Sequence, residues 1–142
     1  MPAYNEAGNI PILVEKLNEM FRQSRLRGEV IIVNDGSTDE TQKQAQEAAS
    51  RYRWLRVINH KVNRGMTAAL ETGFGMARGK TLLLWPADLQ YMPDDIPKMV
   101  AKIEDGYDVV CGWKQGKYGL KRFASFFYNL LSRWIFKLKV HD

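Results

Sequence analysis

Cysteine is almost absent from the sequence, which has one such residue, Cys111, among 142. A single cysteine excludes an intrachain disulfide framework. Because Cys111 lies in the apolar run 109–111, we expect a packed core thiol and a reducing environment. The two histidines, His60 and His141, have no cysteine or histidine at ligand spacing, which argues against a zinc site.

Long apolar stretches and phosphate-binding loops are also missing. No run reaches the roughly 18 residues that a membrane-spanning helix needs. Neither a Gly-x-x-x-x-Gly-Lys loop nor a Gly-x-Gly-x-x-Gly turn after a strand is present, which argues against P-loop and dinucleotide-binding enzymes. With 45% hydrophobic and 26% charged residues, the composition is that of a globular protein with one core.

Negative charge is scarce at the C-terminal end. Residues 113–142 contain seven of the 21 lysines and arginines, one of the 16 acidic residues and half of the aromatic residues. Such a segment suits an anionic partner: lipid headgroups, a lipid phosphate or nucleic acid. Apolar side chains at steps of three and four predict a helix over 120–137. Its apolar stripe faces either the core or a membrane surface, and both interpretations stay open.

The rest of the chain alternates between helix and strand patterns. Ser37 and Glu40 form the Ser-x-x-Glu pattern that is typical of a helix start. The alternation predicts an α/β fold with a mostly parallel sheet flanked by helices. We expect helices at 10–21, 37–51, 67–77, 93–104 and 120–137, strands at 29–34, 55–59, 81–85 and 108–112, and a loop at 115–119. The sequence 1–6 reads as loop and turn, so a first strand is expected to be lacking.

The stretch 81–90 is the most informative part of the sequence. An apolar run, expected to be a buried strand, ends at Trp85, and Asp88 and Gln90 follow. Ligand sites in open α/β sheets lie just past the carboxyl ends of the strands. The oxygens of Asp88 and Gln90 suit a hard cation such as Mg²⁺ or Mn²⁺. The alternative interpretation is that Asp88 only begins a turn before the helix at Pro93.

Two more loops are expected at the same edge of the sheet. They comprise residues 2–6 and 34–39, and each contains an acidic residue. Asp35 accepts hydrogen bonds and is suited to read the N–H groups of a base, while Gly36 lets the backbone approach a ligand closely. At least one acid in each of three loops on a single edge is more than turn formation alone predicts.

Taken in order, these motifs resemble the family 2 glycosyltransferases, in particular the dolichol-phosphate mannosyltransferase-like and polyprenyl-phosphate glycosyltransferase branch. The resemblance covers nearly the whole chain. The matching motifs are Pro2-Ala3-Tyr4-Asn5-Glu6, the run from Val33 to Asp39, Asn63-Arg64-Gly65 with the helix after it, Ala87-Asp88-Leu89-Gln90, Asp108-Val109-Val110 with Gly112-Trp113-Lys114, and Arg122, Ser125 and Asn129.

The resemblance implies a GT-A-type nucleotide-diphosphosugar transferase. Residues 1–142 would form a single partial catalytic domain, with 1–112 binding the nucleotide sugar and 113–142 providing an acceptor loop and a basic amphipathic helix. The implied reaction moves a sugar, with inversion, from a UDP- or GDP-linked donor to a polyprenyl or dolichyl phosphate, assisted by Mg²⁺ or Mn²⁺. It would take place at the cytoplasmic face of a membrane, to which the protein is peripheral or tethered by segments absent from this chain. No nucleic-acid partner is expected.

The resemblance also implies roles for individual residues. Asp88 and Gln90 would hold the cation and, with Arg122, form the catalytic set. Arg122, Ser125 and Asn129 would bind the acceptor phosphate. The donor nucleotide would be bound by Pro2, Ala3, Tyr4, Glu6, Asp35, Gly36, Ser37, Asn63, Gly65 and Ala87.

The sequence departs from the family pattern in two places. Pro86 stands where the family has an acid, which weakens the case for the metal. The family's first strand is expected before Met1 and further sequence after Asp142, so we expect the isolated chain to be poorly active. Two alternatives to the enzyme remain open: a catalytically weakened or inactive scaffold of the same fold that binds nucleotide sugars, and a membrane or nucleic-acid binder driven by the basic tail.

Overall fold

A computed structural model describes residues 1–112 of the chain. Residues 1–108 form one compact unit, and of the second unit, 109–142, the described part is 109–112. The expected loop at 115–119, the expected helix at 120–137 and the acceptor residues Arg122, Ser125 and Asn129 lie outside the described residues. The division of the domain at residue 112 stays a prediction.

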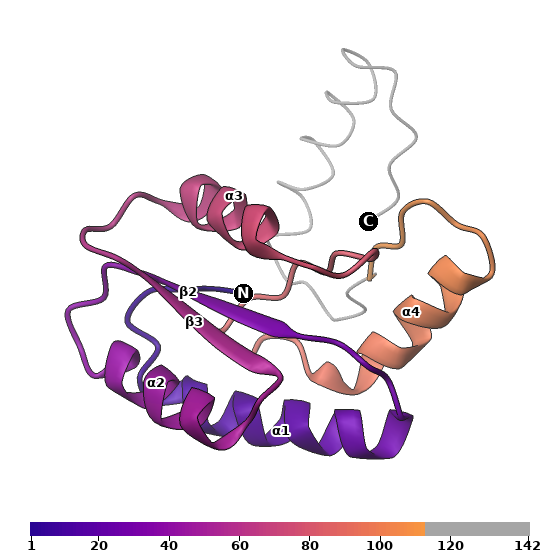
Figure 1. Cartoon of the computed structure of the whole chain (residues 1–142), viewed down its shortest axis with the longest axis horizontal. Helices are drawn as coiled ribbons and strands as arrows, with labels where there is room; N and C mark the ends of the chain where they lie inside the picture. Colours follow the sequence, from indigo (N-terminus) through magenta and orange to yellow (C-terminus); the bar gives the residue numbers. More distant parts are fainter. Residues whose placement is uncertain (113–142) are drawn as a thin grey trace, which may run out of the picture. The chain divides into compact units, whose positions relative to one another are not determined.

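The first unit is built around a parallel sheet (Figure 1). Its strands are β1 (Pro2–Ala3), β2 (Val30–Asp35) and β3 (Leu55–His60), in the order β1-β2-β3. The ladder between β2 and β3 is complete and runs from the pair Val30–Leu55 to the pair Asp35–His60. All three strands point the same way, so the segments after Ala3, Asp35 and His60 emerge at one edge.

Helices cover both faces of this sheet (Figure 1). Helices α1 (Asn9–Ser24) and α2 (Thr41–Arg51) pack on one face, and α3 (Met66–Met76) packs on the other. A 3₁₀ turn (Pro93–Asp95) leads into α4 (Ile96–Glu104). The parallel α/β fold and the helices expected at 10–21, 67–77 and 93–104 are confirmed, as are the strands expected at 29–34 and 55–59.

The core explains why β2 is a continuous apolar run. All six residues of β2 are buried, as expected for a parallel strand covered on both faces. On one face, Ile32 belongs to a cluster with Ile10, Leu13, Val14 and Leu17, which α1 presents at helical spacing. On the other face, a smaller cluster joins Ile31 and Val33 to Ala69 of α3.

The expected strands at 81–85 and 108–112 are not formed, and the expected loop at the start of the chain contains β1. Strand β1 is only two residues long and pairs Pro2 with Val33 and Ala3 with Asn34. A strand needs a neighbour to satisfy its backbone N–H and C=O groups. Residues 81–85 pair with no strand of the described part, and this apolar run adopts no regular secondary structure.

Two smaller predictions are also wrong. The capping box does not form, because α2 begins at Thr41 and Ser37 instead accepts a hydrogen bond from the backbone N–H of Asn5, at 3.0 Å. Cys111 is exposed rather than packed in the core, which is consistent with the absence of a strand at 108–112.

An apolar cleft of about 580 Å³ opens beside the amino end of β2. Its walls include Val30 and Ile31 of β2, Gly73 of α3 and the extended residues 80–85. None of the expected donor-binding or metal-binding residues lines this cleft. The residues expected to form the site lie instead around the opposite, carboxyl ends of the strands.

Candidate functional site at the carboxyl edge of the sheet

The loop after β1 is joined to the loop after β2 by hydrogen bonds. The side-chain oxygen of Asn5 accepts from the backbone N–H of Thr38 at 2.9 Å, while the Asn5 N–H donates to Ser37. The Glu6 N–H donates to the hydroxyl of Thr41 at 2.7 Å, and the Ala7 N–H donates to Asp39 at 3.2 Å. These bonds hold the first two predicted loops together as one surface.

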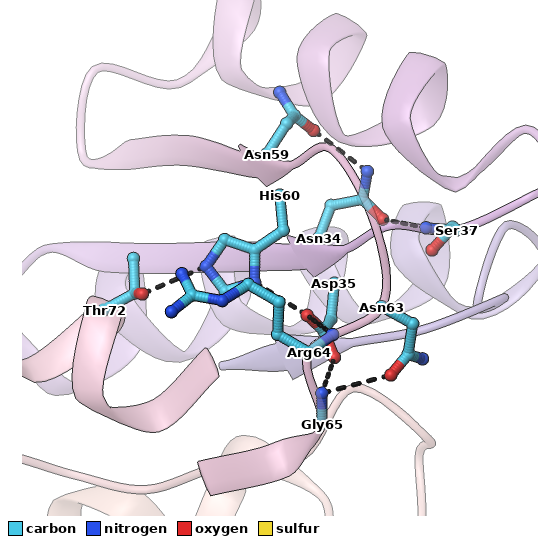
Figure 2. A network of polar contacts seen from close by, with 9 residues as sticks. All are labelled: Asn34, Asp35, Ser37, Asn59, His60, Asn63, Arg64, Gly65 and Thr72. Atoms are coloured by element: carbon cyan, nitrogen blue, oxygen red, sulfur yellow. Dashed lines mark hydrogen bonds and ion pairs between the residues drawn. The ribbon is translucent and has the colours of Figure 1, made fainter. Parts of the chain in front are cut away.

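The carboxylate of Asp35 is the centre of a second network (Figure 2). Its Oδ1 accepts from the backbone N–H of Arg64 at 2.9 Å and lies 2.7 Å from Nδ1 of His60. Its Oδ2 accepts from the backbone N–H of Gly65 at 2.7 Å. The carboxylate thus fastens the end of β3 and the turn 63–65 to the end of β2.

The imidazole of His60 links this carboxylate to α3. Its second nitrogen, Nε2, lies 3.0 Å from the hydroxyl of Thr72 (Figure 2). With Nδ1–H donating to Asp35, Nε2 accepts from the Thr72 hydroxyl, so a neutral ring has both nitrogens paired. The His60 side chain is 6% exposed, which means that these bonds are shielded from water.

The pKa of Asp35 lies below its usual value. Burial alone raises the pKa of this carboxyl group, but the hydrogen bonds from His60 and from the N–H groups of Arg64 and Gly65 more than offset that effect. The group is therefore ionised at neutral pH and acts only as an acceptor.

The backbone at Gly36 packs closely against the backbone of residues 62–63. Gly36 has φ +67°, and a Cβ atom at this position would lie 2.3 Å from the carbonyl carbon of Val62 and 2.4 Å from the Asn63 nitrogen. Beside it, the amide of Asn34 donates to Asn59 at 3.0 Å and accepts from the Ser37 N–H at 3.2 Å (Figure 2). Only glycine allows residues 62–63 to approach so closely.

The third predicted loop, 86–90, is less firmly held. Ala87 is buried in the same core cluster as Ala3, which places the start of this loop against β1. Asp88 Oδ1 accepts from the backbone N–H of Gln90 at 3.0 Å, and Leu89 has φ +57°. Within residues 1–112, no hydrogen bond is found between this loop and the other two.

The predicted site residues of the described part fall into three groups. Pro2 and Ala3 are buried in β1, while Tyr4 is exposed and Glu6 half-buried just after it. Asp35, Gly36, Ser37, Asn63 and Gly65 lie together around the Asp35 network. Ala87, Asp88 and Gln90 lie in the third loop. Their proposed contacts with a ligand stay predictions.

Four residues of the Asp35 network were not predicted as part of the site: Asn59, His60, Arg64 and Thr72. Their signal lies in the register between β2 and β3, since Asn34 is opposite Asn59 and Asp35 is opposite His60. Two polar pairs at the carboxyl ends of neighbouring parallel strands point to a site.

Two searches of residues 1–112 were negative. No group of three or more histidine, cysteine, aspartate or glutamate side chains is arranged to hold a metal ion. No helix in this range combines the length and the hydropathy needed to cross a bilayer.

Comparisons with known proteins agree with this architecture. The chain is 32% identical to a dolichol-phosphate mannosyltransferase of Pyrococcus furiosus over 133 residues, which are 94% of this chain and 37% of that protein. It is 34% identical to a dodecaprenyl-phosphate galacturonate synthase of Rhizobium johnstonii over 147 aligned residues, covering 100% of this chain and 44% of that protein. The chain therefore spans less than half the length of these relatives.

A solved structure supports the same assignment. A mannosyltransferase from Pyrobaculum calidifontis, in complex with GDP-Man and Mn²⁺, matches 92% of this chain and 36% of its own, with a TM-score of 0.63 and 27% identity. The family described as "Glycosyl transferase family 2" matches residues 1–138. The chain belongs to glycosyl transferase family 2.

Proposed function

We propose that this chain is the donor-binding part of an enzyme that transfers a sugar, with inversion, from a nucleotide diphosphate to a polyprenyl or dolichyl phosphate at a membrane surface. The observation that carries the proposal is the joined surface at the carboxyl edge of the sheet, where an ionised Asp35 organises two strand ends and the turn 63–65. The relatives' names include both a dolichol-phosphate and a dodecaprenyl-phosphate enzyme.

The donor nucleotide would lie on this surface. Asp35 would accept a hydrogen bond from the base, and Gly36, whose missing side chain lets residues 62–63 pack closely, would hold the turn beside it. Tyr4, Ser37 and Asn63 would line the pocket, together with Pro2, Ala3, Glu6, Gly65 and Ala87. Except for Ala87 in the third loop, these residues come from the segments that Asn5 and Asp35 hold together.

The third loop fits a divalent cation bound with the help of the donor. Asp88 is half-buried, its Oδ1 is engaged by the Gln90 N–H, and no described residue donates a hydrogen bond to Oδ2. That oxygen and the Gln90 amide are hard ligands of the kind that Mg²⁺ or Mn²⁺ takes, alongside water and phosphate. A cation held there would act as a Lewis acid on the diphosphate leaving group.

The acceptor substrate needs fewer catalytic groups from the protein than the donor does. A lipid phosphate is already ionised at neutral pH, so its attack on the sugar needs no general base. Arg122, with Ser125 and Asn129, would bind that phosphate by charge-assisted hydrogen bonds.

Binding of UDP and GDP, measured by calorimetry with and without Mn²⁺, tests the donor site. We expect nucleotide diphosphate binding that Mn²⁺ strengthens, and Asp88→Asn to remove the effect of Mn²⁺. Asp94→Asn is the matched control, since Asp94 is an exposed acid outside the three loops. No binding of either nucleotide, with Mn²⁺ present or absent, would contradict the proposal.

The alternative is a scaffold of the same fold in which Pro86 has removed the metal and with it catalysis. One observation supports this alternative: within residues 1–112, no group of three or more histidine, cysteine, aspartate or glutamate side chains is arranged to hold a metal ion. Pro86→Asp separates the two cases. If Mn²⁺ strengthens nucleotide binding to the native chain and Pro86→Asp increases that effect, the native site is a weakened enzyme site, whereas a native chain on which Mn²⁺ has no effect supports the scaffold.

A further inference from the structure

The carboxylate of Asp35 has almost no hydrogen-bonding capacity left. An ionised carboxylate offers about four acceptor positions, two on each oxygen. On Oδ1 both are taken, by His60 Nδ1 and by the Arg64 N–H, whereas among residues 1–112 only the Gly65 N–H donates to Oδ2. One acceptor position, on Oδ2, therefore remains.

The burial of Asp35 also limits how many hydrogen bonds a ligand can make to its carboxylate. Asp35 is 4% exposed, and the turn 62–65 lies over the backbone beside it. A ligand that pairs with both oxygens at once needs an open edge of the carboxylate. In Figure 2 that edge is occupied by His60 on one side and by the backbone of Arg64 and Gly65 on the other.

Nucleotide bases differ in how many donors they present to such a group. Uracil has a single ring N–H, flanked by two carbonyl oxygens. Guanine has a ring N–H and an adjacent amino group, and the two donors are spaced to match both oxygens of one carboxylate. An acceptor with one open position satisfies the single N–H donor of uracil, but it leaves either the ring N–H or the amino group of guanine without a partner, which is costly in a buried site.

We propose that Asp35 makes this site selective for a uridine diphosphate donor over a guanosine diphosphate donor, and that His60 is the positioning residue that sets this selectivity. The inference rests on the proposed function, because it assumes that the base meets Asp35. His60 acts by occupying Oδ1, and Thr72 holds the His60 ring in place.

The test compares the dissociation constants of UDP and GDP at fixed Mn²⁺. The two ligands share the ribose and the diphosphate, so the ratio of their affinities reports on the base alone. We expect the native chain to bind UDP about tenfold more tightly than GDP, the usual effect of one unpaired polar group. A native chain that binds GDP as tightly as UDP would overturn the inference about the base but not the proposed donor site. A native chain that binds neither nucleotide would overturn the proposed function itself.

Variants of His60 test its role separately. His60→Leu removes the donor and opens Oδ1, so the preference for UDP should fall to about threefold or less. His60→Asn should restore it, because the Asn amide N–H can take the place of Nδ1–H. Asp94→Asn, a change at an exposed acid outside the three loops, is the control and should leave the ratio unchanged. A role of His60 in stability alone would leave the ratio unchanged in every variant. If His60→Leu does not fold, His60→Ala, which also removes the donor to Oδ1, takes its place and should lower the ratio in the same way.

Discussion

Strand β2 and the stretch 81–90 follow the same sequence pattern but have different structures. Both combine an apolar run with polar residues that follow it. In β2 the run is fully buried, pairs with β3 along its whole length, and its polar residues bond across the strands. Within residues 1–112, the run 81–85 has no ladder and the buried Nε1 of Trp85 has no hydrogen-bond partner, while Leu82 and Leu84 are 52% and 49% exposed.

The difference shows what a strand needs besides apolar residues. Strand β2 pairs with β3 along all six residues and with β1 on its other edge, and its side chains are buried on both faces. Within residues 1–112, the run 81–85 pairs with no strand. The polar groups at the end of β2 are therefore held in place by neighbouring segments, whereas the one hydrogen bond to Asp88 within residues 1–112 comes from its own loop.

The largest expected effect is at Gly36. Gly36→Ala should lower the free energy of unfolding by at least about 3 kcal/mol, because the added Cβ meets backbone atoms of Val62 and Asn63 at a positive φ. Gly8→Ala is the control and should stay within about 0.5 kcal/mol, since nothing lies within 4 Å of its Cβ. Urea denaturation measures both, and equal effects would mean that the turn 62–63 does not pack on Gly36.

A core substitution compares the two apolar runs directly. Ile32→Ala should cost about 3 kcal/mol in urea denaturation, because Ile32 is fully buried between α1 and the sheet. Leu84→Ala should cost less than about 1 kcal/mol, because half of that side chain is already in water. A similar cost for both substitutions would show that 81–85 is packed as tightly as β2.

Acid should weaken the Asp35 network selectively. The pKa of Asp35 is lower in the folded chain than its ordinary value, so the unfolded chain binds more protons as the pH falls toward that value. The stability that Asp35 contributes is thus fully present above its unfolded pKa, about 4, and is lost as the pH falls through its folded pKa.

Asp35→Asn should therefore cost about 2 kcal/mol at pH 7 and progressively less as the pH falls below the unfolded pKa of about 4. Thermal unfolding of both chains between pH 3 and pH 7 measures the difference. Asp94→Asn, a change at an exposed acid, is the control and should follow the native curve. A constant gap between native and Asp35→Asn at all pH values would mean that the charge of Asp35 contributes nothing to stability.

The sequence predicts most of the fold and part of the site. Helix spacing in α1 and the apolar run of β2 are local patterns, and both correspond to real elements because they pack on each other. The run 81–85 is just as apolar, but whether it becomes a strand depends on a neighbour that no local pattern reports. The Ser37–Glu40 pattern failed for a similar reason, since Asn5, 32 residues away, takes the Ser37 hydroxyl instead.

The same reasoning applies to the site residues. Asp35 and Gly36 were found because they follow an apolar run. His60 and Thr72 were missed, because a lone histidine and a helical threonine give no signal until the register and the position of α3 bring them to Asp35.

The smallest expected effect is at Trp85. Trp85 is 7% exposed, packs edge-on against Tyr91 at 6.0 Å, and its Nε1–H has no hydrogen-bond partner in the described chain. Trp85→Phe removes buried apolar surface, which is unfavourable, and also removes an unsatisfied buried donor, which is favourable by about 1–3 kcal/mol. The two terms oppose each other, so the net change in urea denaturation should stay within about 1 kcal/mol. A loss of more than about 3 kcal/mol would mean that the indole N–H is paired, and that 81–85 is held by bonds as specific as those at the end of β2.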